Sequence, residues 1–285
     1  MQNEKPVNFD YTMMSTFLVC RKKYYWRIVR GITGKRPPTA AEFGRCIHLA
    51  LNEWHTHRDE DKAVKVFLDS FIEDPEDSKR TKAVGKKLLE LYCYKYAHEG
   101  FSVLSSELPF LLPVPGTNIK LSGRIDKIIK WDDVLYIMDH KTTSMLGPQF
   151  FYKIKPNMQF DGYIWAANQL GYICNGVVLD ALLVAKGLTI PAQLSKLTPL
   201  ARDISERTPE DIVRYIRNVK LITEDIYKCY ETDVWYENTE SCCDFIECPY
   251  RKICKEDPSI HEQIIEMDYK VEFWDPLKEV KSAQN

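Results

Sequence analysis

An apolar strand that ends in ionisable side chains is the feature that most restricts the fold of this 285-residue chain. Residues 134–143 read VLYIMDHKTT, in which Asp139, His140 and Lys141 follow five largely apolar positions. Side chains alternate across a strand, so Asp139 and Lys141 point to one side while His140 points to the other. An acid and a base are therefore expected together on one side of the strand, at the end where the buried strand reaches the surface.

A second carboxylate is expected opposite the first, because Asp132 and Asp133 predict a tight hairpin turn between this strand and the one before it. Counting back from the turn places Asp126 nearly opposite Asp139. Two carboxylates that close repel each other, so one stays protonated unless a cation lies between them. A hard divalent ion such as Mg²⁺ prefers oxygen ligands, and the main-chain carbonyl of His140 could supply one more. The alternative is a structural Asp–Lys ion pair at the strand end.

The pattern of the rest of the chain predicts an α/β or α+β fold, in which helices flank a mixed central sheet. Apolar residues recur at helical spacing before residue 98, and β-forming residues dominate from 101 to 143. Helices are predicted over 11–29, 39–57, 61–73, 79–98, 148–170 and 208–230, and a further strand over 176–186. This pattern divides the chain into a helical part (1–98), a core (99–200), a C-terminal helix with a cysteine-rich tail (201–270) and a peripheral tail (271–285).

Composition excludes several classes of protein. With 45% hydrophobic residues, 28% charged residues and no biased tract, the chain is typical of a globular rather than a disordered protein. It contains no run of eighteen apolar residues, and its first residues lack a basic region followed by an apolar one. We therefore expect a cytoplasmic protein without a membrane segment.

One short segment is strongly basic, although the net charge of the chain is only −2. Residues 20–40 carry seven Lys or Arg residues and no Asp or Glu. Aromatic residues are interleaved with these cations, a mixture that suits a nucleic acid because cations pair with phosphates and rings stack on bases. The candidate DNA-binding residues are Arg21, Lys22, Lys23, Tyr24 and Arg27. The alternative is a solvated helix face whose aromatic residues belong to the core.

Nine cysteines, an odd number, do not suit a set of disulfides. Four of them fall within thirteen residues near the C-terminus and another stands far upstream, namely Cys242, Cys243, Cys248, Cys254 and Cys20. Thiolates are soft ligands for iron–sulfur clusters or zinc. The tail therefore predicts a metal site, with a cluster of buried thiols as the alternative.

Four stretches of the sequence are similar to those of one family: GRIDKI, YIMDHKTT, QFDGYIWAA and FGRCIHLALNEW. With them the chain resembles the PD-(D/E)XK nuclease superfamily in its RecB-like branch, which includes CRISPR-associated exonucleases with an iron–sulfur cluster. The resemblance covers nearly the whole chain and implies a restriction-endonuclease-like core within a single nuclease domain over 1–270. It also implies that Asp126 and Asp139 are metal-binding carboxylates and that Lys141 is the catalytic lysine of the motif.

The same resemblance implies roles for residues on predicted helices. Gln159 and Tyr163 are four positions apart, so they share a helix face, from which they would hold the strand-end loop and contact the DNA backbone. His48 matches the upstream histidine of the branch, a metal ligand, and an ordinary half-buried histidine is the alternative. The implied ion is Mg²⁺ or Mn²⁺, and its implied ligands are His48, Asp126, Asp139 and the main-chain carbonyl of His140.

For the cysteines, the resemblance implies a [4Fe–4S] cluster held by one upstream and three C-terminal residues. These are Cys20, Cys242, Cys248 and Cys254. Cys243 could replace Cys242, because neither gives the two-residue gap before Cys248 that is common in the family. Zinc is the alternative occupant.

The function that these inferences predict is a metal-dependent deoxyribonuclease that hydrolyses phosphodiester bonds. The resemblance implies an exonuclease acting on single-stranded DNA ends in recombination, repair or CRISPR-type processing, with proteins of such a complex as candidate partners. The alternative is a catalytically silent nuclease-fold subunit that binds DNA or helps to assemble a larger DNA-processing complex. Intact Asp126, Asp139 and Lys141 argue against that alternative.

Overall fold

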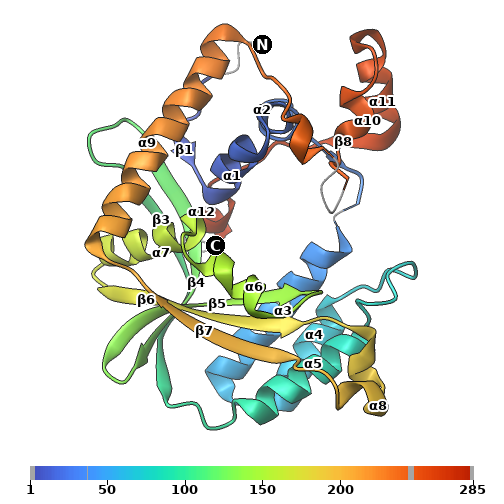
Figure 1. Ribbon diagram of the computed structural model, residues 1–285, viewed down its shortest axis with the longest axis vertical. Helices are drawn as coiled ribbons and strands as arrows, with labels where there is room; N and C mark the ends of the chain where they lie inside the picture. Colours follow the sequence, from blue (N-terminus) through green and yellow to red (C-terminus); the bar gives the residue numbers. More distant parts are fainter. Residues whose placement is uncertain (1–3, 37, 243–246, 283–285) are drawn as a thin grey trace. The chain divides into compact units, whose positions relative to one another are not determined.

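Figure 1 shows a computed structural model of the chain, which describes residues 4–36, 38–242 and 247–282. Contacts between Cα atoms divide the chain into two compact units. The first consists of Met1–Arg36, Pro109–Arg124 and Pro209–Asn285, and the second of Pro37–Leu108 and Ile125–Thr208. Each unit is thus assembled from segments far apart in the sequence, and the single domain over 1–270 stays a prediction.

A mixed sheet contains the strand-end residues. Its strands are β1 (Asn8–Phe9), β3 (Phe101–Pro113), β4 (Lys120–Trp131), β5 (Val134–Thr143), β6 (Cys174–Leu183) and β7 (Leu200–Glu206). They follow the order β1-β4-β5-β6-β7, with β3 paired to β4. The pairs β1–β4 and β5–β6 are parallel, whereas β4–β5 and β6–β7 are antiparallel. This mixed sheet, flanked by helices, confirms the predicted α/β fold of the restriction-endonuclease type.

The turn between β4 and β5 sets their register. Asp132 and Asp133 have positive φ angles of 47° and 65°, as a two-residue hairpin turn of this kind requires. The pairing beyond the turn is regular up to the residue after Asp126. Asp126 therefore stands opposite Asp139, as the count from the turn predicts.

The second unit has helices on both faces of β5 and β6. On one face lie α3 (Thr39–His57), α4 (Glu60–Ser70) and α5 (Lys82–Lys95), joined by a buried apolar cluster (Figure 1). Phe43, Ile47 and Leu51 of α3 are fully buried in that cluster, as their helical spacing predicts. The other face carries α7 (Met158–Gln169). Between β6 and β7 lie a short 3-10 helix (Lys186–Thr189) and α8 (Pro191–Leu194).

The helix predicted over 148–170 is interrupted, which corrects that prediction. It consists of α6 (Pro148–Phe151), a 3-10 turn (Tyr152–Ile154) and, after a break, α7. Pro156 accounts for the break, because proline has no N–H and restricts the residue before it to extended conformations. α7 begins after Asn157, whose side chain accepts hydrogen bonds from the backbone N–H groups of Gln159 and Phe160.

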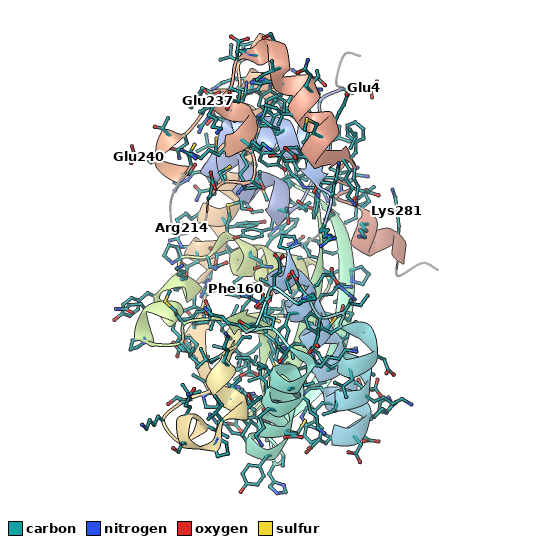
Figure 2. The ribbon with its side chains drawn as sticks, turned by 90° about the vertical axis from the view of Figure 1, so that its right-hand side faces the viewer. Glu4, Phe160, Arg214, Glu237, Glu240 and Lys281 are labelled. Atoms are coloured by element: carbon teal, nitrogen blue, oxygen red, sulfur yellow. The ribbon has the colours of Figure 1, made fainter. Side chains whose placement is uncertain are left out.

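The first unit is mostly helical. Besides β1 and the parts of β3 and β4 within Pro109–Arg124, its elements are α1 (Tyr11–Val19), α2 (Arg21–Tyr24), a π-helical segment (Tyr25–Val29), β2 (Ile32–Gly34), α9 (Pro209–Thr232), α10 (Arg251–Cys254), α11 (His261–Asp268), β8 (Tyr269–Val271) and α12 (Lys278–Ser282), with 3-10 turns at Thr239–Ser241 and Pro258–Ile260. Glu237 and Glu240, in the segment after α9, are exposed (Figure 2). The helix predicted over 11–29 is broken at Cys20, where the backbone is extended with φ −167°. The predicted C-terminal helix is confirmed, whereas β7 and the antiparallel pair β2–β8 were not predicted.

Among the helices of the described ranges, none combines the length and the apolar character that crossing a membrane requires.

Candidate active site

Two buried carboxylates meet where β4 and β5 lie side by side. Asp126 on β4 is 9% exposed and Asp139 on β5 is 1% exposed. The Oδ2 atoms of both are buried, and each lies within ion-pair distance of a basic group: Lys141 Nζ is 2.9 Å from Asp139 Oδ2, and His48 Nδ1 is 3.1 Å from Asp126 Oδ2. Lys141 Nζ lies 3.0 Å from Asp139 Oδ1, so the acid and the base share one side of β5. Two buried carboxylates this close together repel each other, and a bound cation would stabilise both in the ionised form.

His48 brings a third group to these carboxylates from α3. Its Nδ1 atom lies 3.1 Å from Asp126 Oδ2, and its Nε2 atom lies 2.5 Å from the main-chain oxygen of His140. Gly44, one turn earlier, lets α3 approach β5, because a Cβ atom there would lie only 3.3 Å from Thr142 Oγ1. His48 therefore contacts two of the groups with which it is predicted to share a metal ion.

The two carboxylates have opposite pKa shifts. Burial raises the pKa of Asp139 to about 6 despite Lys141, and the charge of Asp126 adds to the rise. Burial also acts to raise the pKa of Asp126, but the interaction with His48 outweighs it and holds that pKa well below its usual value. For His48, the same interaction outweighs burial and raises the pKa. A divalent ion would supply the positive charge that keeps both carboxylates ionised.

The donor atoms suit a hard divalent ion. Two carboxylates, a main-chain carbonyl and an imidazole are ligands that proteins use for Mg²⁺ or Mn²⁺. In the described part of the chain, no three His, Cys, Asp or Glu residues are already spaced as a metal cage, and His48 and Asp126 contact each other directly. The convergence of these donors on two buried carboxylates is the observation that fits an ion.

α7 presents Gln159 and Tyr163 on one face, as their spacing predicts. Gln159 Nε2 donates a hydrogen bond to Tyr163 Oη at 2.9 Å. Phe160, labelled in Figure 2, has its ring centroid 5.9 Å from Lys141 Nζ, so the first turn of α7 adjoins the strand end. The contact of Gln159 and Tyr163 with DNA stays a prediction.

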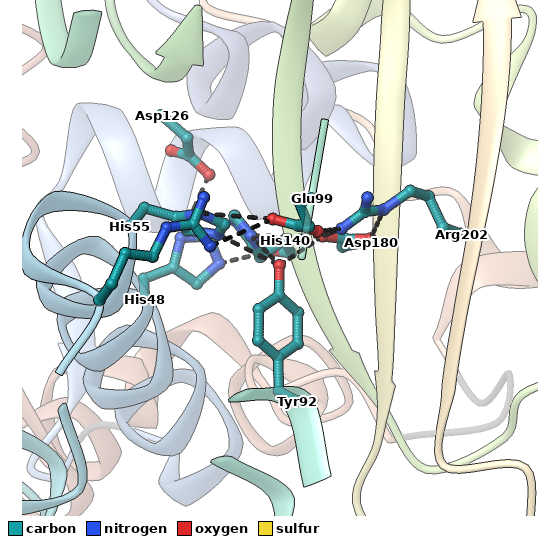
Figure 3. Close-up of polar contacts among 9 residues, drawn as sticks. His48, His55, Tyr92, Glu99, Asp126, His140, Asp180 and Arg202 are labelled. Atoms are coloured by element: carbon teal, nitrogen blue, oxygen red, sulfur yellow. Dashed lines mark hydrogen bonds and ion pairs between the residues drawn. The ribbon is translucent and has the colours of Figure 1, made fainter. Parts of the chain in front are cut away.

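Polar side chains on the other face of β5 were not predicted. His140 points to that face, and Tyr92, Asp180 and Arg202 gather around it (Figure 3). Lys127 of β4 is also buried, and burial lowers its pKa. One signal was available in the sequence, because Asp180 interrupts the apolar run VVLDALL of a predicted buried strand.

The candidate iron–sulfur ligands lie in the first unit. Asn238 links two of them, because its N–H donates to Cys20 Sγ at 3.3 Å and its carbonyl accepts from Cys242 Sγ at 3.7 Å. The N–H of Cys248 donates to the carbonyl of Cys242 at 3.0 Å. Contacts through Asn238 and the main chain therefore connect the upstream cysteine with two of the tail.

The fourth candidate, Cys254, packs against the same apolar cluster as Cys248. Its Sγ atom accepts a hydrogen bond from Trp26 Nε1 at 3.3 Å, and burial raises the pKa of its thiol. None of the eight cysteines in the described ranges forms a disulfide. Cys243 lies outside the described residues, so the choice between Cys242 and Cys243 stays a prediction.

The basic segment of residues 20–40 departs from expectation at one position. Tyr24 is fully buried and stacks on Trp235, with ring centroids 5.7 Å apart, so its ring cannot contact a nucleic acid. The assignment of Tyr24 to DNA binding is therefore corrected, because this ring belongs to the core. The other candidates are half-buried and their contact with DNA stays a prediction: Arg21, Lys22, Lys23 and Arg27.

Comparison with protein families matches residues 9–255 to the PD-(D/E)XK nuclease superfamily. Comparison with curated proteins finds no match. A solved structure described as "Crystal structure of SSO0001" has 13% sequence identity and a TM-score of 0.33, over 79% of this chain and 77% of that chain. The family match spans the whole strand-end site, from His48 to Tyr163. This chain therefore belongs to the PD-(D/E)XK nuclease superfamily.

Proposed function

We propose that this chain is a metal-dependent deoxyribonuclease, and more narrowly an exonuclease that acts on single-stranded DNA ends. The observation that carries the proposal is the convergence of two buried carboxylates with two basic groups: Lys141 Nζ lies 2.9 Å from Asp139 Oδ2, and His48 Nδ1 lies 3.1 Å from Asp126 Oδ2. Membership of a nuclease superfamily supports a DNA substrate. We place the protein in the RecB-like branch, in recombination, repair or CRISPR-type processing, with proteins of such a complex as partners.

In this proposal His48, Asp126, Asp139 and the His140 carbonyl would hold a Mg²⁺ or Mn²⁺ ion. That ion supplies positive charge that activates water and stabilises charge on the phosphate. Water attacks the phosphorus and gives up a proton, the P–O bond to the leaving sugar oxygen breaks, and that oxygen takes up a proton. Lys141, whose Nζ lies 3.0 Å from Asp139 Oδ1, is placed to orient the attacking water and to neutralise negative charge on the phosphate.

Linear and circular single-stranded DNA of the same sequence should separate exonuclease from endonuclease action. We expect Mg²⁺- or Mn²⁺-dependent degradation of the end-labelled linear strand and no loss of the circle, because an exonuclease needs a free end. EDTA should stop the reaction, since the ion supplies the charge that activates water. The measurement is the length of the products over time. Cutting of the circle would contradict exonuclease action, and degradation of duplex DNA alone would contradict the single-strand preference.

We further propose a [4Fe–4S] cluster in the first unit. Its ligands are Cys20, Cys242, Cys248 and Cys254, with Cys243 as the substitute for Cys242. The hydrogen bonds from Asn238 and Trp26 to sulfur support the cluster, because such bonds surround iron–sulfur sites and tune their potentials. Zinc is the alternative, since it also takes thiolate ligands.

Protein purified without oxygen should be brown and contain about four irons per chain. Cys254→Ser should lose most of this iron, because the hydroxyl is a poor replacement for a thiolate ligand. Cys93→Ser is the matched control, since Cys93 lies in the apolar cluster of the second unit and should leave the iron content unchanged. Iron and zinc are measured on the same samples by mass spectrometry. Zinc in place of iron, or equal iron in both variants, would contradict the proposed cluster.

A further inference from the structure

A buried polar network lies on the face of β5 opposite the carboxylates. We call it the His140 network, and its members are His140, Tyr92, Asp180, Arg202, Glu99 and His55 (Figure 3). They come from α3, α5, β5, β6, β7 and the segment between α5 and β3. His140 and Asp180 are each 1% exposed, so these polar groups are removed from water. Such groups need specific partners, and the network supplies most of them.

The hydroxyl of Tyr92 is the centre of the network. It donates to Asp180 Oδ2 at 2.7 Å, and it also lies 3.2 Å from His140 Nε2 and 3.1 Å from His55 Nε2. Because a phenol has a single proton, which goes to Asp180, both imidazoles must donate to its oxygen from Nε2–H. The Nδ1 atoms of both rings then carry no proton; neither forms a hydrogen bond with the described residues, and His55 Nδ1 lies 3.8 Å from Glu99 Oε2.

Arg202 anchors the network from β7. Its guanidinium donates to Asp180 through Nε and, at 2.9 Å, through Nη2, and it also donates to Glu99 Oε1 at 2.5 Å. The guanidinium carbon lies 4.1 Å from the centre of the Tyr96 ring. Arg202 therefore holds the Asp180 carboxyl group in place, and the position of the Tyr92 hydroxyl follows from it.

The network and the metal site meet at a single residue. The side chain of His140 belongs to the network, while its main-chain oxygen lies 2.5 Å from His48 Nε2. The neighbouring residues, Asp139 and Lys141, point to the opposite face of the same strand. Fixing the imidazole on one face therefore fixes the carbonyl and the peptide units that carry the acid and the base.

We infer that the His140 network positions the proposed metal site, with the side chains of Tyr92 and His140 as positioning groups that touch neither the ion nor the DNA. The inference rests on the proposed function. Stability alone does not explain the network, because replacing buried ion pairs with apolar residues of similar size is often neutral or stabilising. Partners that orient metal ligands from outside typically change metal affinity or activity by about 10–100-fold when they are removed.

The test compares Tyr92→Phe with Tyr96→Phe. Both substitutions remove one phenol hydroxyl and keep the ring, and the two rings pack together with centroids 4.7 Å apart. For Tyr92→Phe we expect a fall in kcat and a rise in the Kd for Mn²⁺, each by about 10-fold or more, with unchanged affinity for DNA. Tyr96→Phe should match the wild type in kcat, in the Kd for Mn²⁺ and in affinity for DNA. Mn²⁺ binding is measured by calorimetry, cleavage in single-turnover assays and unfolding by its Tm.

A second pair of variants tests the side chain of His140 itself. The amide of His140→Gln can still donate a hydrogen bond to the Tyr92 oxygen, whereas His140→Leu cannot. We expect His140→Gln to keep a tighter Mn²⁺ site and a faster kcat than His140→Leu. Equal losses in the two variants would contradict positioning through the hydrogen bond.

The outcomes separate this inference from the proposed function. A Tyr92→Phe variant with a lower Tm but the Mn²⁺ affinity and kcat of the wild type would overturn the inference, because the network would then only stabilise the fold. A wild type that binds Mn²⁺ but cleaves no DNA would contradict the proposed function, and the Mn²⁺ affinities of the variants would still decide the inference. A wild type that neither binds Mn²⁺ nor cleaves DNA would overturn both.

Discussion

Lys141→Met should slow DNA cleavage by about 10²- to 10⁴-fold, the range typical of losing a group that handles protons in the transition state. Methionine keeps most of the length and apolar stem of lysine, but it cannot orient water or neutralise charge on the phosphate. Lys141 Nζ is held 3.0 Å from Asp139 Oδ1, so its place beside the proposed ion is well defined. The rate is measured under single-turnover conditions with end-labelled single-stranded DNA, and affinity for DNA separately in Ca²⁺.

The matched control is Lys65→Met, which removes one positive charge from an exposed position on α4 of the same unit. It should cleave DNA like the wild type. A rate for Lys141→Met close to that of the control would exclude Lys141 from catalysis. A loss that arises entirely from weaker DNA binding would make Lys141 a phosphate contact instead.

Asp126→Asn should weaken Mn²⁺ binding by about 100-fold or more and reduce cleavage in parallel. Replacing a residue that binds the ion should weaken ion binding more than replacing a residue that only orients such a ligand. The latter typically lowers metal affinity or activity by about 10–100-fold. Asparagine keeps the shape of the side chain but removes the charge that pairs with His48 and that holds a hard cation. Calorimetry with Mn²⁺ measures the affinity, and the Mn²⁺ concentration giving the half-maximal rate provides an independent value.

Asp133→Asn is the control for this prediction. Asp133 lies in the turn of the same hairpin with its side chain 91% exposed, and asparagine tolerates its positive φ as well as aspartate does. This variant should bind Mn²⁺ like the wild type. If Asp126→Asn also bound Mn²⁺ normally, the ion would have to be held elsewhere, and the assignment of Asp126 would fail.

The strand-end half of the site could be predicted from sequence because it follows local rules. Alternation along β5 places Asp139 and Lys141 on one side, and the two-residue turn at Asp132 and Asp133 sets Asp126 opposite Asp139. Both rules apply to residues that are close together in the sequence, and the turn residues themselves specify how β4 and β5 pair. The helix over 39–57 was predictable for the same reason, since its apolar residues recur with the helical period.

The other half of the site, His48 and the His140 network, depends on contacts between segments that are far apart in the chain. A single sequence contains no pattern from which such contacts can be predicted. His48 and His140 are 92 positions apart, and only the family resemblance pointed to His48. Tyr92 occupies a buried position in α5, so nothing in the sequence shows that its hydroxyl serves three partners. Residues 200–206 were missed because β7 is at the end of the strand order, where charged residues are tolerated.

Tyr24 shows why composition alone misleads at the basic segment. Cations and rings that alternate in sequence suit a nucleic-acid surface and an ordinary amphipathic helix equally well. The break at Cys20 and the π-helical segment after Tyr24 change which side chains face inward, and neither was predicted. The burial of this ring is therefore a tertiary outcome rather than a consequence of the local pattern.

The central claim is that the protein cleaves DNA with the help of a divalent ion bound at Asp126 and Asp139. One cleavage assay tests this claim most directly. Wild type and Asp139→Asn are incubated with end-labelled single-stranded, double-stranded and flapped DNA over a range of Mn²⁺ concentrations. We predict that the wild type shortens single-stranded DNA only when Mn²⁺ is present and that Asp139→Asn leaves it intact at every concentration. Equal cleavage by both proteins would contradict the proposed site, and a wild type inert on all three substrates would favour a catalytically silent DNA-binding subunit.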